Sequence, residues 1–224
     1  MNRIFFIIFL SVLPNVFVWS KAVCHEQKKE SSCHSVSLSG GLTFDDTWKV
    51  ELSYRFTPFR YTGIGIGIGY WSQYGNEDIP HETMIWTVNK DTKDIGDFYL
   101  RPNIMFYTPS LFHIRDCYFT IFANPGAILN IPYGNANIDL IDNTGVVTGS
   151  DNVHNSHGKW SAFDLRFGLR FGTEDTHFFI GYELSTMDVY GMYRRMEYRN
   201  VKFNDFYPHC KNQKGLIFDI SVGL

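Results

Sequence analysis

The chain has 224 residues, enough for one domain with a sizeable core or for a single closed barrel. Charged residues make up only 19% and aromatic residues 17%, which excludes disordered, coiled-coil and collagen-like chains. The formal net charge is -3 and no block of Lys and Arg occurs, so we expect no nucleic-acid partner.

The N-terminus carries the pattern of an export signal. Arg3 is followed by an apolar run over 4–19 and then by the small residues Ser20 and Ala22, as at a signal-peptide cleavage site. The run is shorter than the roughly 20 apolar residues that a spanning helix needs. We therefore predict a cleaved signal peptide over 1–22 and a short periplasmic segment over 23–34. A retained anchor and a lipoprotein with its lipid on Cys24 are the alternatives.

The number of cysteines is even, in agreement with export to an oxidising compartment. They are Cys24, Cys33, Cys117 and Cys210, and the sequence does not choose among their three possible pairings. No CxxC motif occurs, and we expect neither a cofactor nor a bound metal.

From Val36 onward the chain repeatedly alternates apolar and polar residues, the pattern of strands with two different faces. The clearest case runs from Trp48 to Phe56, where Lys, Glu, Ser and Arg alternate with apolar residues. Such runs occur at 36–44, 48–56, 64–70, 98–106, 118–127, 160–172, 178–186 and 216–224. Most have about the 9 to 11 residues with which a tilted strand crosses a bilayer.

The connections between these runs give a second signal. Those after the second, fourth and sixth runs are short, whereas long ones cover 72–97, 129–159 and 187–213. Short periplasmic turns and longer outer loops alternate in this way in outer-membrane barrels. We predict an all-β fold, an eight-stranded antiparallel up-and-down transmembrane β-barrel over 35–224, located in the outer membrane.

The polar faces of the predicted strands would point into a narrow barrel interior, which side chains fill. They carry five acids and five bases, a balance that predicts a closed lumen crossed by salt bridges. The predicted network consists of Lys49, Glu51, Arg55, Asp97, Arg101, Asp164, Arg166, Arg170, Glu183 and Asp219. Aromatic residues near strand ends predict interfacial girdles, and these are Trp48, Tyr61, Trp71, Tyr107, Trp160 and Phe171.

With these features the chain resembles the small eight-stranded bacterial outer-membrane β-barrels, the family of the OmpA-like transmembrane domain and of opacity and adhesin-type barrels. The most specific piece is 213–220, which fits the polar, any, Gly, any, any, aromatic, any, apolar signal of such barrels. The resemblance implies contact with outer-membrane lipid and lipopolysaccharide. It also implies that the C-terminal strand engages the outer-membrane insertion machinery.

The long connections hold the candidates for binding. Arginine and tyrosine are favoured at binding hot spots, so the last one predicts a surface for an unknown extracellular partner. Its residues are Tyr193, Arg194, Arg195, Tyr198, Arg199 and Lys202. Packing of these aromatics against the barrel rim is the alternative. Strand-like pieces at 83–88, 138–141 and 146–148 predict hairpins above the membrane.

The expected function is thus a non-enzymatic barrel that binds a surface partner or has a structural role in the envelope. A small pore or transporter is one alternative. A lipid A-modifying enzyme is another, because His154 and Ser156 resemble the His-x-Ser of a deacylating barrel, with Asp164 or Glu174 as the acid. A soluble lipocalin-like barrel is the third, and it would have the aliphatic faces inside.

Overall fold

The computed structural model describes residues 33–44, 47–73, 85–89, 95–115, 117–173, 175–207, 209 and 212–224. The predicted signal peptide over 1–22 lies outside the described residues, and so does almost all of the predicted periplasmic segment over 23–34. Within the described part, Cys33 is disulfide-bonded and Cys117 is a free thiol.

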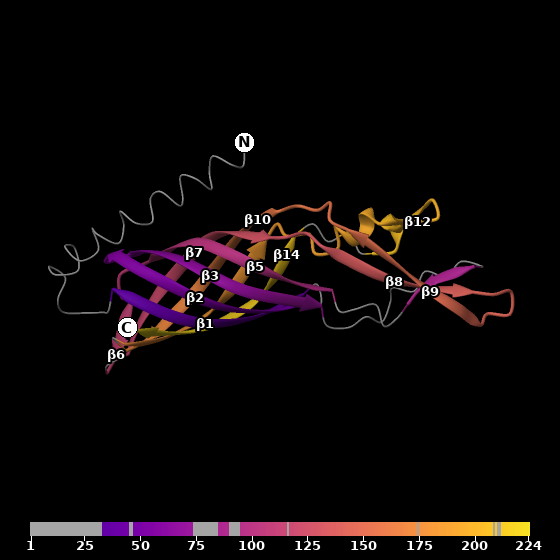
Figure 1. Ribbon diagram of the computed structural model, residues 1–224. Helices are drawn as coiled ribbons and strands as arrows, with labels where there is room; N and C mark the ends of the chain where they lie inside the picture. Colours follow the sequence, from indigo (N-terminus) through magenta and orange to yellow (C-terminus); the bar gives the residue numbers. More distant parts are fainter. Residues whose placement is uncertain are drawn as a thin grey trace, which may run out of the picture.

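Eight long strands form a closed antiparallel barrel (Figure 1). They are β1 (His34–Thr43), β2 (Thr47–Phe59), β3 (Thr62–Gln73), β5 (Gly96–Tyr107), β7 (Cys117–Asn130), β10 (Ser161–Gly172), β11 (Thr176–Ser185) and β14 (Gln213–Gly223). Each pairs with the next in this order, and β14 pairs with β1 from Ser35 opposite Gly223 to Thr43 opposite Gly215. This confirms the predicted eight-stranded antiparallel barrel, which closes without a free edge.

The strand alternation separates a polar interior from an apolar exterior. Along β2, Lys49 and Glu51 point inward and are 4% and 3% exposed, whereas the next residue, Leu52, points outward and is 59% exposed. The same outward pattern continues around the barrel in Leu38, Ile68, Ile104, Phe167, Ile180 and Phe218. A continuous apolar exterior of this size fits lipid and not water. The lipocalin-like alternative is therefore wrong, because it requires the apolar faces inside.

Aromatic side chains cluster at both ends of the apolar exterior. At the end with the short turns, the rings of Phe112, Phe119, Phe171 and Phe178 stack in series with centroids 4.5, 5.9 and 5.7 Å apart. At the other end Tyr70 packs against Trp48 at 5.7 Å and Phe98 at 4.9 Å. Two predicted girdle residues, Trp71 and Tyr107, were assigned wrongly, because each points inward and packs with buried residues.

The short turns lie together at one end. Only Arg60 and Tyr61 separate β2 from β3, and 173–175 separate β10 from β11. The connection between β5 and β7 contains a further strand, β6 (Phe112–Ile114), which continues the hairpin with β7. None of the helices in the described part of the chain has the length and apolar character to cross a membrane.

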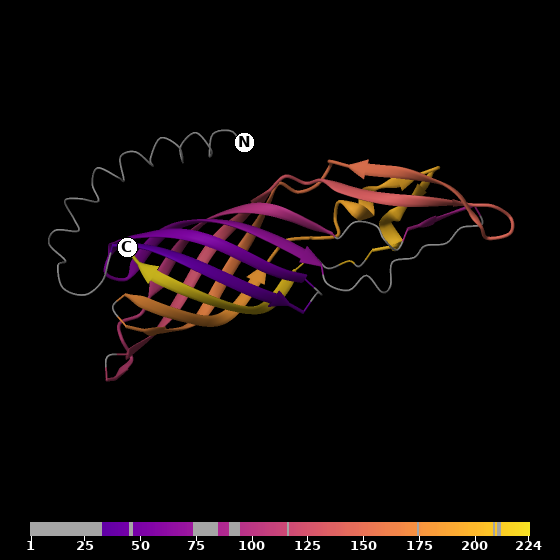
Figure 2. The same ribbon diagram turned by 60° about the horizontal axis from the view of Figure 1, so that its bottom comes forward.

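The long connections fold together beyond the opposite end of the barrel (Figures 1 and 2). Their strands are β4 (Trp86–Val88), β8 (Gly134–Ile141), β9 (Val147–Asn155), β12 (Glu197–Tyr198) and β13 (Val201–Lys202), and their 3-10 helices are η1 (Tyr193–Arg195) and η2 (Phe203–Asp205). We call the described residues 85–89, 131–159 and 187–209 the head. The predicted pieces at 138–141 and 146–148 form the tip of the β8 and β9 hairpin. This hairpin pairs with β4 in a separate three-stranded sheet instead of extending the barrel strands.

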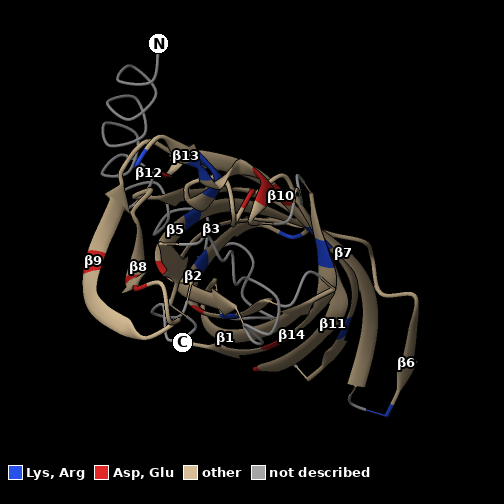
Figure 3. Cartoon of the chain, turned by 90° about the vertical axis from the view of Figure 1, so that its right-hand side faces the viewer, with Lys and Arg blue, Asp and Glu red and all other residues tan. Residues whose placement is uncertain are grey.

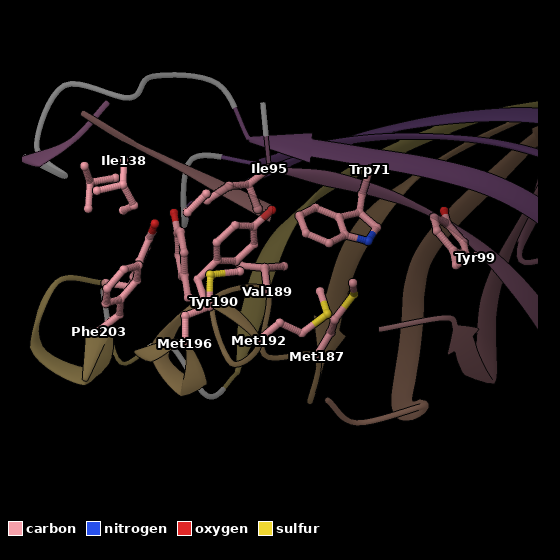
Figure 4. Packing of buried hydrophobic residues seen from close by; sticks show 14 of the residues in the cluster. Trp71, Ile95, Tyr99, Ile138, Met187, Val189, Tyr190, Met192, Met196 and Phe203 are labelled. Atoms are coloured by element: carbon pink, nitrogen blue, oxygen red, sulfur yellow. The ribbon is translucent and has the colours of Figure 1, made fainter. Parts of the chain in front are cut away.

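The head has an apolar core of its own (Figure 4). Trp86 and Ile138 of the sheet pack against Tyr193, Met196 and Phe203 from the last connection. The Trp86 ring lies 6.0 Å from the ring of Phe203 and meets the ring of Tyr198 edge-on at 5.3 Å. Three inward residues from the barrel end, Trp71, Tyr99 and Ile128, belong to the same core. The head is therefore packed onto the barrel mouth and is not a set of independent loops.

Candidate functional site

The lumen below the head is crossed by a layer of buried ion pairs. Lys49 of β2 pairs with Glu183 of β11, and Arg101 of β5 pairs with Asp164 of β10. Arg166 of β10 makes a two-pronged contact with Glu51, from Nη1 to Oε1 at 3.0 Å and from Nη2 to Oε2 at 2.8 Å. Bidentate contacts of this kind are among the strongest hydrogen bonds in proteins. Figure 3, which views the barrel from the head end, shows basic and acidic positions around its wall.

Secondary contacts join these pairs into one network. Arg166 Nε lies 3.6 Å from Asp164 Oδ2 and 3.5 Å from Glu183 Oε2, and Arg101 Nη1 lies 3.8 Å from Glu51 Oε1. Tyr99 donates to Glu51 Oε2 at 3.0 Å. Three bases therefore meet three acids, and each of these side chains is at most 6% exposed. Equal numbers of buried acids and bases are required here, because an unpaired buried charge costs several kcal/mol.

Glycines on β3, the strand between β2 and β5, make room for the network. A Cβ at Gly67 of β3 would lie 2.6 Å from Glu51 Oε1, so a larger residue there would displace the carboxylate. Below the ion pairs, Met105, Phe122 and Phe179 form a small apolar cluster. A cavity of about 20 Å³ lies between the two layers, room for about one or two water molecules. The described lumen is thus filled with side chains from the head down to this apolar cluster.

Four of the ten predicted lumen residues lie outside the ion-pair network. Asp97 sits at the outer rim and accepts the backbone N–H of Phe98 at 2.8 Å. Asp219 is in the lumen, and Arg55 and Arg170 are nearer the short turns. No ion pair within the described residues includes any of these four. Alternation gives the direction in which a side chain points but not its height, which depends on the stagger between neighbouring strands.

The predicted outer binding surface is smaller than the sequence suggests. Tyr193 is 4% exposed and belongs to the head core, and Arg194 pairs with Asp188 at 2.5 Å. Tyr198 packs on Trp86 and donates from its hydroxyl to Asp151 Oδ2 at 3.0 Å. The exposed members of the predicted set are Arg195, Arg199 and Lys202.

The residues of the enzyme alternative are not assembled in the described structure. His154 is exposed on β9 and makes no described hydrogen bond to Ser156, while Asn155 between them donates to Met192 O at 2.8 Å. Asp164 lies in the lumen on Arg101, and Glu174 lies outside the described residues. Among the residues that the structure places, no three His, Cys, Asp or Glu side chains group as metal ligands.

Sequence reasoning missed three polar members of the lumen, Tyr99, Asn103 and Asn124. Arg101 Nη2 donates to Asn124 O at 2.9 Å, and Asn124 Nδ2 donates to Asn103 Oδ1 at 2.8 Å. Tyr99 stands two residues before the predicted Arg101, so alternation alone would have placed it inward.

No protein-family model matches the sequence, and no curated protein matches it. Solved structures similar to the chain include small outer-membrane β-barrels. Neisserial surface protein A is 6% identical, covering 85% of this chain and 94% of that one, with a TM-score of 0.41. Ail, the attachment invasion locus protein of Yersinia pestis, is 12% identical, and the match covers 87% of this chain and 97% of that one, with a TM-score of 0.42. The outer membrane enzyme PagL is 10% identical, and the match covers 85% of this chain and 99% of that one, with a TM-score of 0.35.

Proposed function

We propose that the protein is an integral outer-membrane barrel without enzymatic activity, which holds its head at the cell surface to bind a surface partner. One observation carries this proposal: the three long outer connections share a single apolar core, packed on a lumen closed by ion pairs. A chain whose only task is to span the membrane has no need of such a core outside it. The proposed role of the barrel is to anchor the head.

The filled lumen argues against a pore. An ion would have to pass the head core, the ion-pair network and the Met105, Phe122 and Phe179 cluster in succession. In planar bilayers we expect no defined conductance from the purified full-length protein. Reproducible stepwise conductance from the folded wild-type protein would contradict the closed-barrel part of the proposal.

The exposed bases Arg195, Arg199 and Lys202 favour a partner with negative charge, such as lipopolysaccharide. Charge reversal of all three should weaken binding to purified lipopolysaccharide at least about tenfold, measured by surface plasmon resonance. The matched control is Lys159→Glu, an exposed lysine at the edge of the head. Equal binding by the triple variant and the wild type would remove these bases from the proposed surface.

Surface display of the head is tested by proteolysis of intact cells. Arg199 is exposed in the turn between β12 and β13, and Arg60 is exposed in the turn between β2 and β3 at the other end of the barrel. We expect trypsin to cut after Arg199 in intact cells and after Arg60 only when the outer membrane has been permeabilised. Cleavage at Arg60 but not Arg199 in intact cells would invert the proposed orientation.

A further inference from the structure

Two arginines face each other across the lumen near the short turns, outside the ion-pair network. Arg55 of β2 and Arg170 of β10 both lie against the ring of Phe179, with Cζ 5.5 and 5.8 Å from its centroid. Both also contact Tyr107: Arg55 Nη1 donates to its hydroxyl at 3.2 Å, and Arg170 Cζ lies 4.5 Å from its ring centroid. The aromatic side chains therefore hold the two guanidinium groups close to each other.

These guanidinium groups are short of anionic partners. Arg55 is only 5% exposed, and neither arginine has a carboxylate within 4 Å among the described residues. The Nε atoms of both are buried without a hydrogen-bond partner, and so are Thr120 Oγ1 and Ser221 Oγ. Buried donors are normally satisfied, so a group of unsatisfied donors of this kind indicates an acceptor that comes from outside the chain.

The nearest acid does not supply that acceptor. Asp219 acts on Arg55 electrostatically but takes its side-chain hydrogen bond from Ser37, and its Oδ1 is itself buried without a hydrogen-bond partner, so it does not reach either arginine. Two positive charges therefore face one negative charge in this part of the lumen, whereas the network above is balanced at three and three. The excess favours a ligand with at least one negative charge.

The two arginines lie toward the end of the barrel with the short turns, which is the periplasmic end in the proposed orientation. Tyr107 is the last residue of β5, Arg170 lies two residues before the end of β10, and His177 is the second residue of β11. Arg170 and Tyr107 are partly exposed, while the ion-pair network and the head close the other side. Among the described residues, the side of the short turns is therefore the one from which we expect a small solute to enter.

We propose that Arg55 and Arg170 form a periplasm-facing binding site for a phosphate group. The planar guanidinium fork matches the oxygens of phosphate, and the neighbouring Tyr107 hydroxyl, which accepts from Arg55, keeps its own proton for a further acceptor. Free phosphate and the headgroup of a phospholipid share this chemistry. Phosphate binding by the two arginines does not depend on partner binding by the head, whereas the periplasmic location of the site rests on the orientation proposed above.

The test is calorimetric titration of the full-length protein, in a phosphate-free non-ionic detergent, with inorganic phosphate. We expect saturable binding that Arg55→Gln and Arg170→Gln each weaken at least tenfold. Arg60→Gln, in the adjacent exposed turn, is the matched control and should bind as the wild type does. Absence of wild-type binding up to about 10 mM phosphate, or unchanged binding in both lumen variants, would overturn the proposal.

Two further measurements keep the result interpretable. Phenylglyoxal modification of the wild type, mapped by mass spectrometry, should be slowed at Arg55 and Arg170 by phosphate, and equal modification rates would overturn the site even if a variant does not fold. Repeating the titration in the same phosphate-free detergent with and without added phosphatidylglycerol separates the two sources. Competition by the anionic lipid would assign a headgroup, and unchanged phosphate affinity would assign a free anion.

Discussion

Glu51 joins two arginines and one tyrosine in the lumen. Its carboxylate accepts hydrogen bonds from Nη1 and Nη2 of Arg166 and from the Tyr99 hydroxyl, and it lies 3.8 Å from Arg101 Nη1. Because all of these groups are buried, removal of the carboxylate charge leaves a positive charge that water cannot reach. The cost of such a broken pair is about 3 to 5 kcal/mol.

We therefore expect Glu51→Gln to lower the free energy of unfolding by about 3 kcal/mol, measured by urea titration of the refolded barrel in detergent. The control is Asp97→Asn at the rim, where no ion pair is described, and it should cost less than about 1 kcal/mol. Equal effects of the two variants would mean that the network does not stabilise the lumen.

The ionisation of Tyr193 reports whether the head core excludes water. Burial raises the pKa of Tyr193 to about 12, and burial also raises the pKa of Tyr207 in the same core. The folded head keeps protons that the unfolded chain loses above its ordinary tyrosine pKa near 10. The stability contributed by Tyr193 is therefore complete below pH 10 and is lost between about pH 10 and 12.

Ultraviolet titration of wild type and Tyr193→Phe checks this expectation. The difference between the two curves should contain one phenol that ionises near pH 12. A difference curve centred near pH 10 would show that Tyr193 is open to water and that the head core does not form.

At the scale of elements, the barrel strands could be predicted because each has one face in lipid and one in a polar interior. The head could not be predicted in the same way, because its core joins segments far apart in sequence, such as Trp86, Ile138 and Phe203. Even so, one signal was available. Trp71 shares the alternation of Gly65, Gly67 and Gly69, which face the lumen, so its inward direction could have been inferred from the sequence.

The turn of the β8 and β9 hairpin contains a position that favours glycine. Gly145 has a φ of 82°, and Asp142 Oδ1 accepts from the backbone N–H groups of Thr144 at 2.8 Å and Val146 at 3.0 Å. A side chain at Gly145 would meet no neighbouring atom within 4 Å, so only backbone strain opposes substitution.

Gly145→Ala should cost the hairpin about 1 to 2 kcal/mol, seen as faster amide hydrogen exchange in β8 and β9. The control is Gly149→Ala on β9, where the backbone is extended and the new Cβ would lie 3.6 Å from Leu140 Cδ1. Faster exchange in the control than in Gly145→Ala would contradict the turn geometry.

At the scale of the whole molecule, the inward direction of the lumen side chains could be predicted from the sequence. Which of these side chains form ion pairs with one another could not. Arg55 and Glu51 share a face of β2, yet only Glu51 reaches the network, because the stagger of the strands places Arg55 beside Phe179. The predicted balance of five acids and five bases thus did not identify the pairs, which involve three acids and three bases among the described residues.

The apolar exterior gives a prediction that distinguishes a membrane barrel from a soluble one. Ile68 lies near the middle of β3 and is 64% exposed, and Val146 at the hairpin tip is 59% exposed. Refolded into lipid vesicles, Ile68→Lys should lose about 2 to 4 kcal/mol because its charge enters the bilayer, whereas Val146→Lys should lose almost nothing. Similar small losses in both variants would place the Ile68 face in water.

The most direct test of the central claim, a membrane barrel with charges inside and apolar residues outside, is a gel of fractionated cells. The outer-membrane fraction is extracted with detergent and compared with and without boiling. We expect the protein in this fraction, with a band that migrates differently after boiling because the closed barrel resists the detergent until it is heated. A soluble band that boiling does not shift would contradict the account.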